Sequence, residues 1–184
     1  MYNELTWIEC DGGPYILIES RYLGIWKGES DEAFEKAKKY YEEIGLMEDY
    51  IGKLKIGSGK CLIVSEDAAA CAWISDNNTS GFLIGVNYVS EDYADGGIKA
   101  DALLSQLNKI PEEQFLDINL TYQVADQELY LFAACDFGND WIYNYDKFNL
   151  LPGDYCIKMM EEYIYDGSSL LLFRFSKQEN TGYQ

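Results

Sequence analysis

The 184-residue sequence contains no histidine, and its few cysteines are far apart. Without histidine there can be no Ser–His or Cys–His pair to activate a nucleophile. A zinc site would have to use cysteines and carboxylates alone, and no two of the five cysteines are close in sequence: Cys10, Cys61, Cys71, Cys135 and Cys156. We therefore expect no metal, no cofactor and no enzymatic activity. The thiols are expected to be reduced and buried.

Basic residues and long apolar runs are also scarce. The chain has 14 Lys and Arg against 32 Asp and Glu, which gives a net charge of −18. Such a chain repels nucleic acid and anionic membranes and attracts basic partners. No uncharged run reaches the roughly 18 residues that span a bilayer, and no signal peptide is visible at the N-terminus. We expect a cytoplasmic protein that binds neither nucleic acid nor membrane.

Apolar residues, by contrast, are abundant at 48%, and 16 tyrosines are among them. This content indicates a folded core, and the length suits one domain, 1–178, with a flexible tail, 179–184. Helices are predicted only between Ser30, as the N-cap, and Gly45, and within 99–109. Strands are predicted at 6–10, 15–19, 60–65, 70–75, 81–89, 115–124, 128–135, 155–165 and 169–175. The pattern predicts an α+β fold: a mainly antiparallel β-sheet with about two helices.

Three glycine-containing segments resemble ligand-binding loops but are predicted to be turns. The Gly-Gly pair near the N-terminus and segment 57–60 (GSGK) are each followed by a strand, so neither is a phosphate loop. Segment 76–81 (DNNTSG) lacks the glutamate that a calcium loop needs at its twelfth position. The first segment is predicted to be a hairpin turn that leads into an edge strand at 15–19, and it consists of Asp11, Gly12, Gly13 and Pro14.

Segment 7–18 (WIECDGGPYILI) resembles the N-terminal signature of the immunity protein 21 family. Members of that family begin with Trp-Ile-Glu, two variable residues, Gly-Gly-Pro and an aliphatic strand. Later landmarks follow in the family's order: Trp26 with Gly28, an Asp-Tyr segment at 49–52, a Gly-rich strand at 57–64, an Ala-Trp pair at 72–73 and a Pro-Gly turn at 151–155. Tyr15 departs from the family's leucine, and region 87–95 has no counterpart that aligns.

This resemblance implies an immunity protein, which binds and neutralises a cognate bacterial toxin domain of a polymorphic toxin system. Such an inhibitor needs a complementary surface and no nucleophile. Its negative charge suits a basic toxin, such as one that acts on nucleic acid. Two other functions stay open. One is a small-molecule or carbohydrate-binding module, which the many tyrosines would suit, and the other is a hydrolase that uses two carboxylates.

Two segments mix acids with aromatics as protein interfaces do. In the first, the candidate partner-binding residues are Asp136, Asp140, Trp141, Tyr143, Tyr145 and Asp146. The aromatics of this segment alternate, so they could equally line the core from one face of a strand. In the second, the candidates are Tyr88, Glu91, Asp92, Tyr93 and Asp95, with a turn before the second helix as the alternative.

Overall fold

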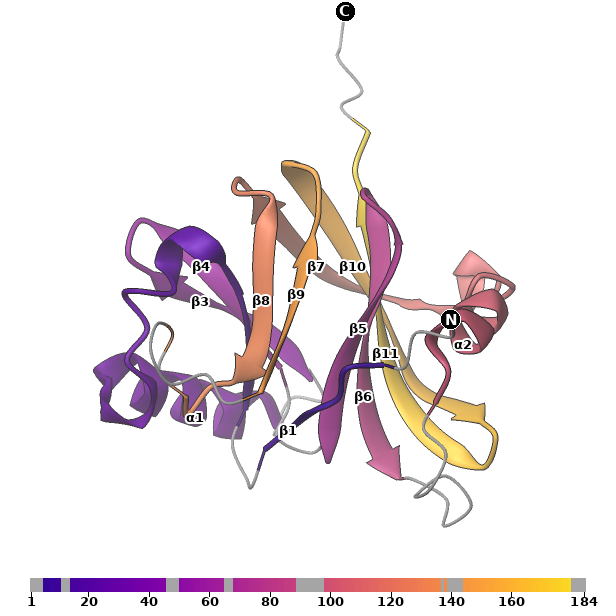
Figure 1. Cartoon of the computed structure of the whole chain (residues 1–184), viewed down its shortest axis with the longest axis horizontal. Coiled ribbons are helices and arrows are strands. Elements are labelled where there is room, and N and C mark those ends of the chain that lie inside the picture. The colour runs from indigo at the N-terminus through magenta and orange to yellow at the C-terminus, as the bar shows by residue number, and fades with distance from the viewer. Residues whose placement is uncertain are drawn as a thin grey trace, which may run out of the picture.

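Two antiparallel sheets face each other in this computed structural model, and one α-helix lies on the outside of each sheet (Figure 1). The structure describes residues 5–10, 14–45, 50–64, 68–88, 98–136, 138 and 144–179. Eleven strands and two α-helices lie within these ranges, together with the short 3-10 helices η1 (Ser20–Tyr22), η2 (Gly28–Ser30) and η4 (Glu112–Gln114). The predicted α+β class, mainly antiparallel sheet, is confirmed.

One sheet has six strands, in the order β1-β5-β6-β11-β10-β7. They are β1 (Ile8–Glu9), β5 (Ala70–Asn77), β6 (Ser80–Tyr88), β7 (Leu116–Val124), β10 (Gly153–Tyr165) and β11 (Ser168–Lys177). The β5–β6 and β10–β11 hairpins are joined by the β6–β11 ladder. The turn predicted at 76–81 connects β5 to β6 and is confirmed.

The other sheet has five strands, in the order β3-β4-β2-β8-β9. They are β2 (Tyr15–Glu19), β3 (Ile51–Ile56), β4 (Gly59–Val64), β8 (Glu128–Ala133) and β9 (Tyr145–Asn149). The turn predicted at 57–60 joins β3 to β4, and Gly57 has a φ of 52° there, which favours glycine. Strands β3 (IGKLKI) and β9 (YDKFN) were not predicted, because glycine, lysines and acids interrupt their apolar pattern.

The core forms three layers, because both faces of both sheets are covered. The inter-sheet layer contains residues of both sheets, such as Leu17 and Leu83. Helix α1 (Glu32–Gly45) packs Phe34 against the outer face of the five-stranded sheet. Helix α2 (Ala100–Leu107) packs Leu103 and Leu107 against the outer face of the six-stranded sheet. Central strands are therefore apolar on both faces, as in sheets that are covered on both sides.

The two helices lie where the sequence places them, with a different cap on the first. The Asp31 carboxylate accepts a hydrogen bond of 2.9 Å from the backbone N–H of Ala33, and Ser30 instead donates to the Lys27 carbonyl. Asp31 is thus the N-cap of α1, and the prediction of Ser30 was wrong by one residue. No helix in the described part of the chain is both long and apolar enough to cross a bilayer.

The predicted N-terminal hairpin is wrong. Strand β1 pairs with β5 in the six-stranded sheet, whereas β2 pairs with β4 and β8 in the other sheet. Strand β2 is also central rather than at an edge, and every residue in it is buried. Pro14 is buried just before it, and its carbonyl accepts from the N–H of Ala134 at 2.8 Å. Residues Asp11, Gly12 and Gly13 lie outside the described residues.

Candidate functional site

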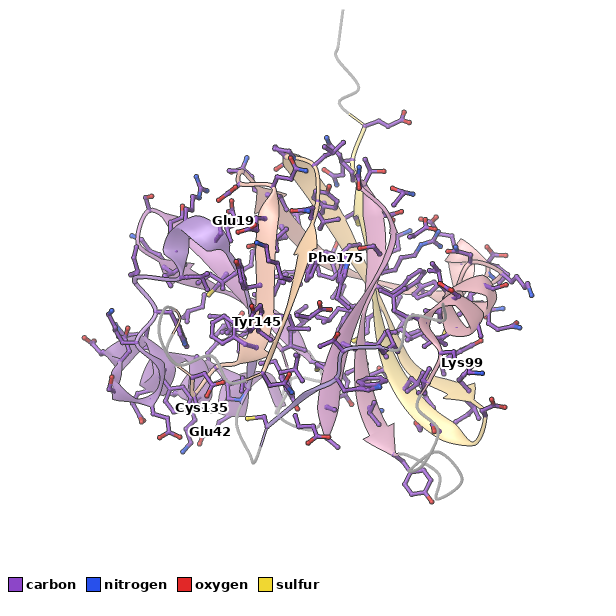
Figure 2. The ribbon with its side chains drawn as sticks, viewed as in Figure 1. Glu19, Glu42, Lys99, Cys135, Tyr145 and Phe175 are labelled. Atoms are coloured by element: carbon purple, nitrogen blue, oxygen red, sulfur yellow. The ribbon has the colours of Figure 1, made fainter. Side chains whose placement is uncertain are left out.

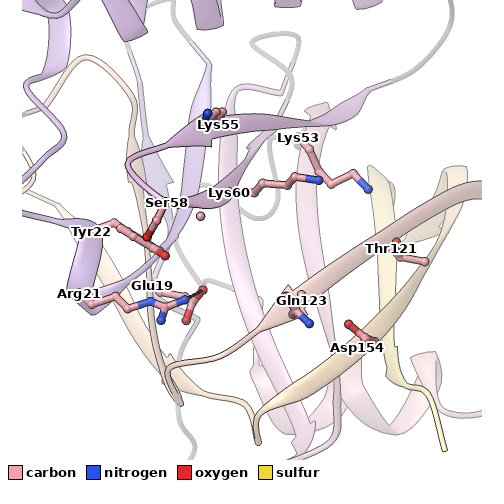
Figure 3. Close-up of a pocket in the computed structure, with 11 residues that line it drawn as sticks. Glu19, Arg21, Tyr22, Lys53, Lys55, Ser58, Lys60, Thr121, Gln123 and Asp154 are labelled. Atoms are coloured by element: carbon pink, nitrogen blue, oxygen red, sulfur yellow. Dashed lines mark hydrogen bonds and ion pairs between the residues drawn. The ribbon is translucent and has the colours of Figure 1, made fainter. Parts of the chain in front are cut away.

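The most distinctive surface feature is a groove between the β3–β4 hairpin of one sheet and β7 of the other (Figure 3). It consists of two adjoining cavities that share Lys53, Lys55 and Lys60. The first has a volume of about 320 Å³ and is also lined by Glu19, Arg21, Tyr22, Ser58, Gly59, Thr121, Gln123 and Asp154. The second has a volume of about 420 Å³ and is also lined by Tyr40, Ile51, Gly52, Ile118 and Leu120. We call this feature the lysine groove.

The alternation of β3 explains how the lysines come to lie there. Ile51 points into the inter-sheet core, and successive side chains of a strand alternate between faces, so Lys53 and Lys55 lie on that same inner face. Lys60 of β4 is the register partner of Lys55 and shares its face. The inner face of this hairpin thus changes from apolar to cationic toward its turn. The space between the sheets, filled by side chains elsewhere, is open here.

Among the described residues, these three lysines form no ion pair, whereas five other cations do. The ion pairs among the described residues are Arg21–Glu19, Lys36–Glu32, Lys39–Glu43, Lys147–Glu128 and Lys158–Glu112. None of them involves Lys53, Lys55 or Lys60. Like charges directly opposite each other on neighbouring strands are destabilising. A protein with a net charge of −18 therefore gathers three lysines in one groove, without an ion pair to any described residue, although Glu19 and Asp154 also line it.

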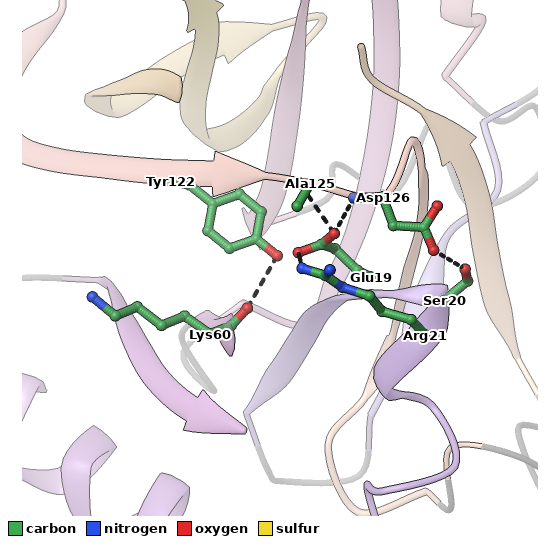
Figure 4. A network of polar contacts seen from close by, with 7 residues as sticks. All are labelled: Glu19, Ser20, Arg21, Lys60, Tyr122, Ala125 and Asp126. Atoms are coloured by element: carbon green, nitrogen blue, oxygen red, sulfur yellow. Dashed lines mark hydrogen bonds and ion pairs between the residues drawn. The ribbon is translucent and has the colours of Figure 1, made fainter. Parts of the chain in front are cut away.

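One wall of the groove is fixed by a buried carboxylate (Figure 4). Glu19, at the end of β2, is 1% exposed and accepts hydrogen bonds from the backbone N–H groups of Ala125 (3.1 Å) and Asp126. It also accepts from the Arg21 guanidinium at 3.1 Å. Ser20 donates to the Asp126 carboxylate at 2.6 Å and lowers the pKa of that carboxyl. These bonds join β2 of one sheet to the β7–β8 turn.

The Tyr122 hydroxyl forms a further link between the sheets. It lies on β7 and donates to the Lys60 carbonyl at 3.4 Å. Burial, and secondarily the Glu19 charge, raise the pKa of Tyr122 well above its usual value, so this phenol stays protonated and remains a donor. The backbone of β4 is thereby held next to β7 beneath the lysines.

The structure divides the first predicted interface segment between two faces of β9. Tyr145 is 46% exposed, and its ring lies 5.6 Å from that of Tyr130 on the outer face. Asp146 lies on the opposite face, where it is half-buried beside Trp73. Asp136 follows β8, whose Phe132 pairs with Tyr145, so Asp136 and Tyr145 lie at the same end of the sheet. The remaining candidates of this segment, Asp140, Trp141 and Tyr143, lie outside the described residues.

The second predicted segment starts at the end of β6. Tyr88 is 59% exposed there, which is the behaviour expected of an interface residue. It belongs to the six-stranded sheet, whereas Tyr145 belongs to the five-stranded one, so the two segments are not neighbours in one sheet. The other candidates of this segment lie outside the described residues: Glu91, Asp92, Tyr93 and Asp95.

A third cavity, of about 460 Å³, lies between α2, β5 and β9 and contains two acids, Asp101 and Asp146. Burial raises the pKa of the Asp146 carboxyl, although backbone N–H groups of Lys147 and Trp73 partly oppose this shift. The Trp73 ring, which also lines this cavity, stacks on Phe148 at 4.1 Å and is largely buried in the core. Among the described residues, no three His, Cys, Asp or Glu side chains are grouped so as to hold a metal ion.

The lysine groove was missed because β3 was not predicted. The signal that could have found it is the K-x-K spacing of Lys53 and Lys55 with Lys60 just after a glycine turn, which places all three on one face of a hairpin. Comparison with known proteins gives no further guide: no family model, no curated protein and no solved structure matches the chain.

Proposed function

We propose that this chain is an immunity protein that binds and neutralises a protein toxin through its surface. The observation that carries the proposal is the exposed Tyr145 on the edge strand β9, at an acidic end of the five-stranded sheet. Figure 2 shows Tyr145 and Cys135 toward the lower end of this sheet. Burial raises the pKa of the Cys135 thiol, and the nearby charges of Asp136 and Glu29 raise it further.

An aromatic ring beside acids supplies the two things a protein inhibitor needs. A tyrosine buries a large area at low entropic cost and is enriched among the residues that dominate binding energy. The acids, together with the net charge of −18, attract a basic partner from a distance and raise its association rate. The resemblance of segment 7–18 to the immunity protein 21 family gives the partner its class, a toxin domain.

The test is binding of the toxin-like protein encoded by the adjacent gene, with association and dissociation rates measured over a range of ionic strength. The Debye length falls from about 10 Å at 0.1 M salt to about 3 Å at 1 M, so the association rate should fall steeply and the dissociation rate only weakly. Asp136→Asn should slow association, whereas Glu113→Gln, which removes an exposed charge of the η4 segment, should do so less.

Tyr145→Ala should speed dissociation by roughly tenfold or more, as expected when an interface anchor is lost. Ile164→Ala is the matched control, because Ile164 is 60% exposed at the far hairpin of the other sheet and should have no effect. A Tyr88→Ala variant that speeds dissociation while Tyr145→Ala does not would move the interface to the end of β6. If the toxin-like protein does not bind, the proposal is wrong.

A carboxylate-dependent hydrolase is a second candidate, because Asp101 and Asp146 line one cavity and the pKa of Asp146 is raised. Paired acids with separated pKa values are typical of glycoside hydrolysis. A screen with chromogenic glycosides tests this function. Turnover that is lost in both Asp101→Asn and Asp146→Asn would support it, and absence of turnover in the unmodified protein would exclude that activity on those glycosides.

A further inference from the structure

We propose that the lysine groove binds an acidic, extended segment of a partner protein, which pairs with β3 as an additional strand. The inference goes beyond the proposed function and does not depend on it. It rests on a free strand edge, on two lysines of that edge strand with a third lysine on its neighbour, and on a facing edge strand that is bulged.

The free edge is that of β3. This strand is the first in the order β3-β4-β2-β8-β9, and among the described residues it pairs only with β4. An edge strand presents unpaired N–H and C=O groups to which another chain can bond. The cavity of about 420 Å³ reaches this edge, since Ile51 and Gly52 of β3 line it. Tyr40 of α1 packs against Gly52, where a Cβ would lie 2.4 Å from the Tyr40 ring, and so closes the outer side.

The spacing of the cations matches an acidic strand. Lys53 and Lys55 are two residues apart on one face, which is about 7 Å along an extended chain. A strand paired with β3 would place its own alternate side chains beside them at cross-strand distances of about 4.5–5.5 Å. Acids at every second position would then lie next to Lys53 and Lys55, and also near Lys60. A small anion such as phosphate could reach only part of this row.

The facing wall is provided by β7, an edge strand that is itself poorly suited to pairing. Its ladder with β10 shifts register between Ile157 and Lys158, and Asn119 has a φ of 53° at this bulge. Bulges at sheet edges disrupt pairing. Ile118 and Leu120, on either side of Asn119, line the groove and pack against the inter-sheet core. The segment would therefore bond to β3 rather than to β7.

Lysines on an edge strand can instead serve to prevent two copies of a protein from pairing edge to edge. Two features favour a binding role. Lys53 is only partly exposed, and although Lys55 and Lys60 are exposed, all three lysines line the groove between the sheets. Lys55 and Lys60 are also directly opposite each other, a repulsion that two neighbouring acids of a ligand would relieve.

The experiment uses the full chain and a fluorescent peptide, Thr-Glu-Val-Glu-Thr-Glu-Ser, in anisotropy titrations at low ionic strength. The matched peptide Thr-Glu-Glu-Val-Thr-Glu-Ser has the same composition and charge, but no two of its acids are two residues apart, so no two can lie beside Lys53 and Lys55 at once. The groove variant is Lys53→Gln, Lys55→Gln and Lys60→Gln together. The control variant is Lys36→Gln, Lys38→Gln and Lys39→Gln together, which makes the same change in net charge on helix α1.

We expect the alternating peptide to bind the unmodified protein more tightly than the matched peptide does. The groove variant should lose about tenfold in affinity, or about 1.4 kcal/mol, which is the sum of three modest ion pairs. The control variant should lose less than about twofold. Binding should slow hydrogen exchange at the amides of 51–56, because they gain hydrogen bonds.

Four results would overturn the proposal. The first three are equal affinity for the two peptides, an equal loss of affinity in the two variants, and unchanged hydrogen exchange at the amides of 51–56 when the peptide binds. The fourth is displacement of the peptide by inorganic phosphate but not by sodium chloride at equal ionic strength. The last would make the groove a small-anion site. If the groove variant binds no peptide but dimerises, the lysines serve to block edge pairing. None of these results bears on binding of the adjacent toxin-like protein.

Discussion

Replacing Glu19 should destabilise the protein more than replacing any exposed acid. This side chain is 1% exposed, and it accepts from the N–H groups of Ala125 and Asp126 and from the Arg21 guanidinium. It holds the β7–β8 turn of one wall of the lysine groove against β2 of the other sheet. The perturbations that separate its contributions are Glu19→Ala, Glu19→Gln and Arg21→Ala.

The magnitude follows from what each change leaves unpaired. Glu19→Ala removes the buried acceptor of two N–H groups, those of exposed Ala125 and partly exposed Asp126, and of the Arg21 guanidinium, so a loss of about 2–4 kcal/mol is expected. Glu19→Gln keeps one acceptor oxygen and should cost about 1–2 kcal/mol. The Arg21 side chain is 45% exposed, so Arg21→Ala loses a solvent-screened ion pair and should cost no more than about 1 kcal/mol.

Urea denaturation followed by tryptophan fluorescence measures these losses, with the slope on denaturant concentration checked for constancy. For a chain of this length, a loss of about 3 kcal/mol should also lower the melting temperature by roughly 6–12 °C. The reasoning would be refuted if Glu19→Ala cost less than about 1 kcal/mol, or if it cost the same as Arg21→Ala. Either result would mean that water replaces the carboxylate without penalty and that the turn is not held by Glu19.

Other predictions concern a buried acid, two thiols and one glycine. Burial raises the folded-state pKa of Asp146 above its ordinary value of 3.8, so the stability that its protonated form contributes is complete below that pH and is lost as the pH rises. Asp146→Asn should therefore melt higher than the unmodified protein at pH 7, with the gain vanishing toward pH 3; a gain that grows on acidification would contradict this. Burial raises the pKa of Cys61 to about 12 and that of Cys71 also, so neither should react with Ellman's reagent until the protein unfolds. Gly28 has a φ of 57°, and an added Cβ would lie 2.2 Å from the Cys135 carbonyl oxygen. Gly28→Ala should therefore lower the free energy of unfolding by at least about 1–3 kcal/mol. Thermal melts measure this loss, and an unchanged melting temperature would refute the clash.

The sequence by itself determined the strands, helices and turns that depend on the pattern of neighbouring residues. Alternating apolar residues predict strands such as β6, and a polar turn marks its hairpin with β5. The stripe of α1 and the proline after α2 predict both helices. The amount of strand and its antiparallel character follow from short connections alone, which is why the fold class could be predicted.

Pairing between distant strands was decided only by the tertiary structure. The prediction that 6–10 and 15–19 form a hairpin assumed that consecutive strands pair, as most do. Here β1 pairs with β5 instead, and β2 is central between β4 and β8. Nothing local distinguishes these outcomes, because both place the same apolar side chains in a core.

In the lysine groove, too, the sequence determined one part of the arrangement and the tertiary structure decided the rest. The sequence by itself determined that Lys53 and Lys55 share a face, once β3 is a strand, because the side-chain period of a strand is two. Register placed Lys60 directly opposite Lys55. The packing of the two sheets made this face an inner one and made β7 the facing wall. These contacts join residues about 60 positions apart, and their geometry depends on the whole core, so only the tertiary structure could bring a cationic groove together in an acidic protein.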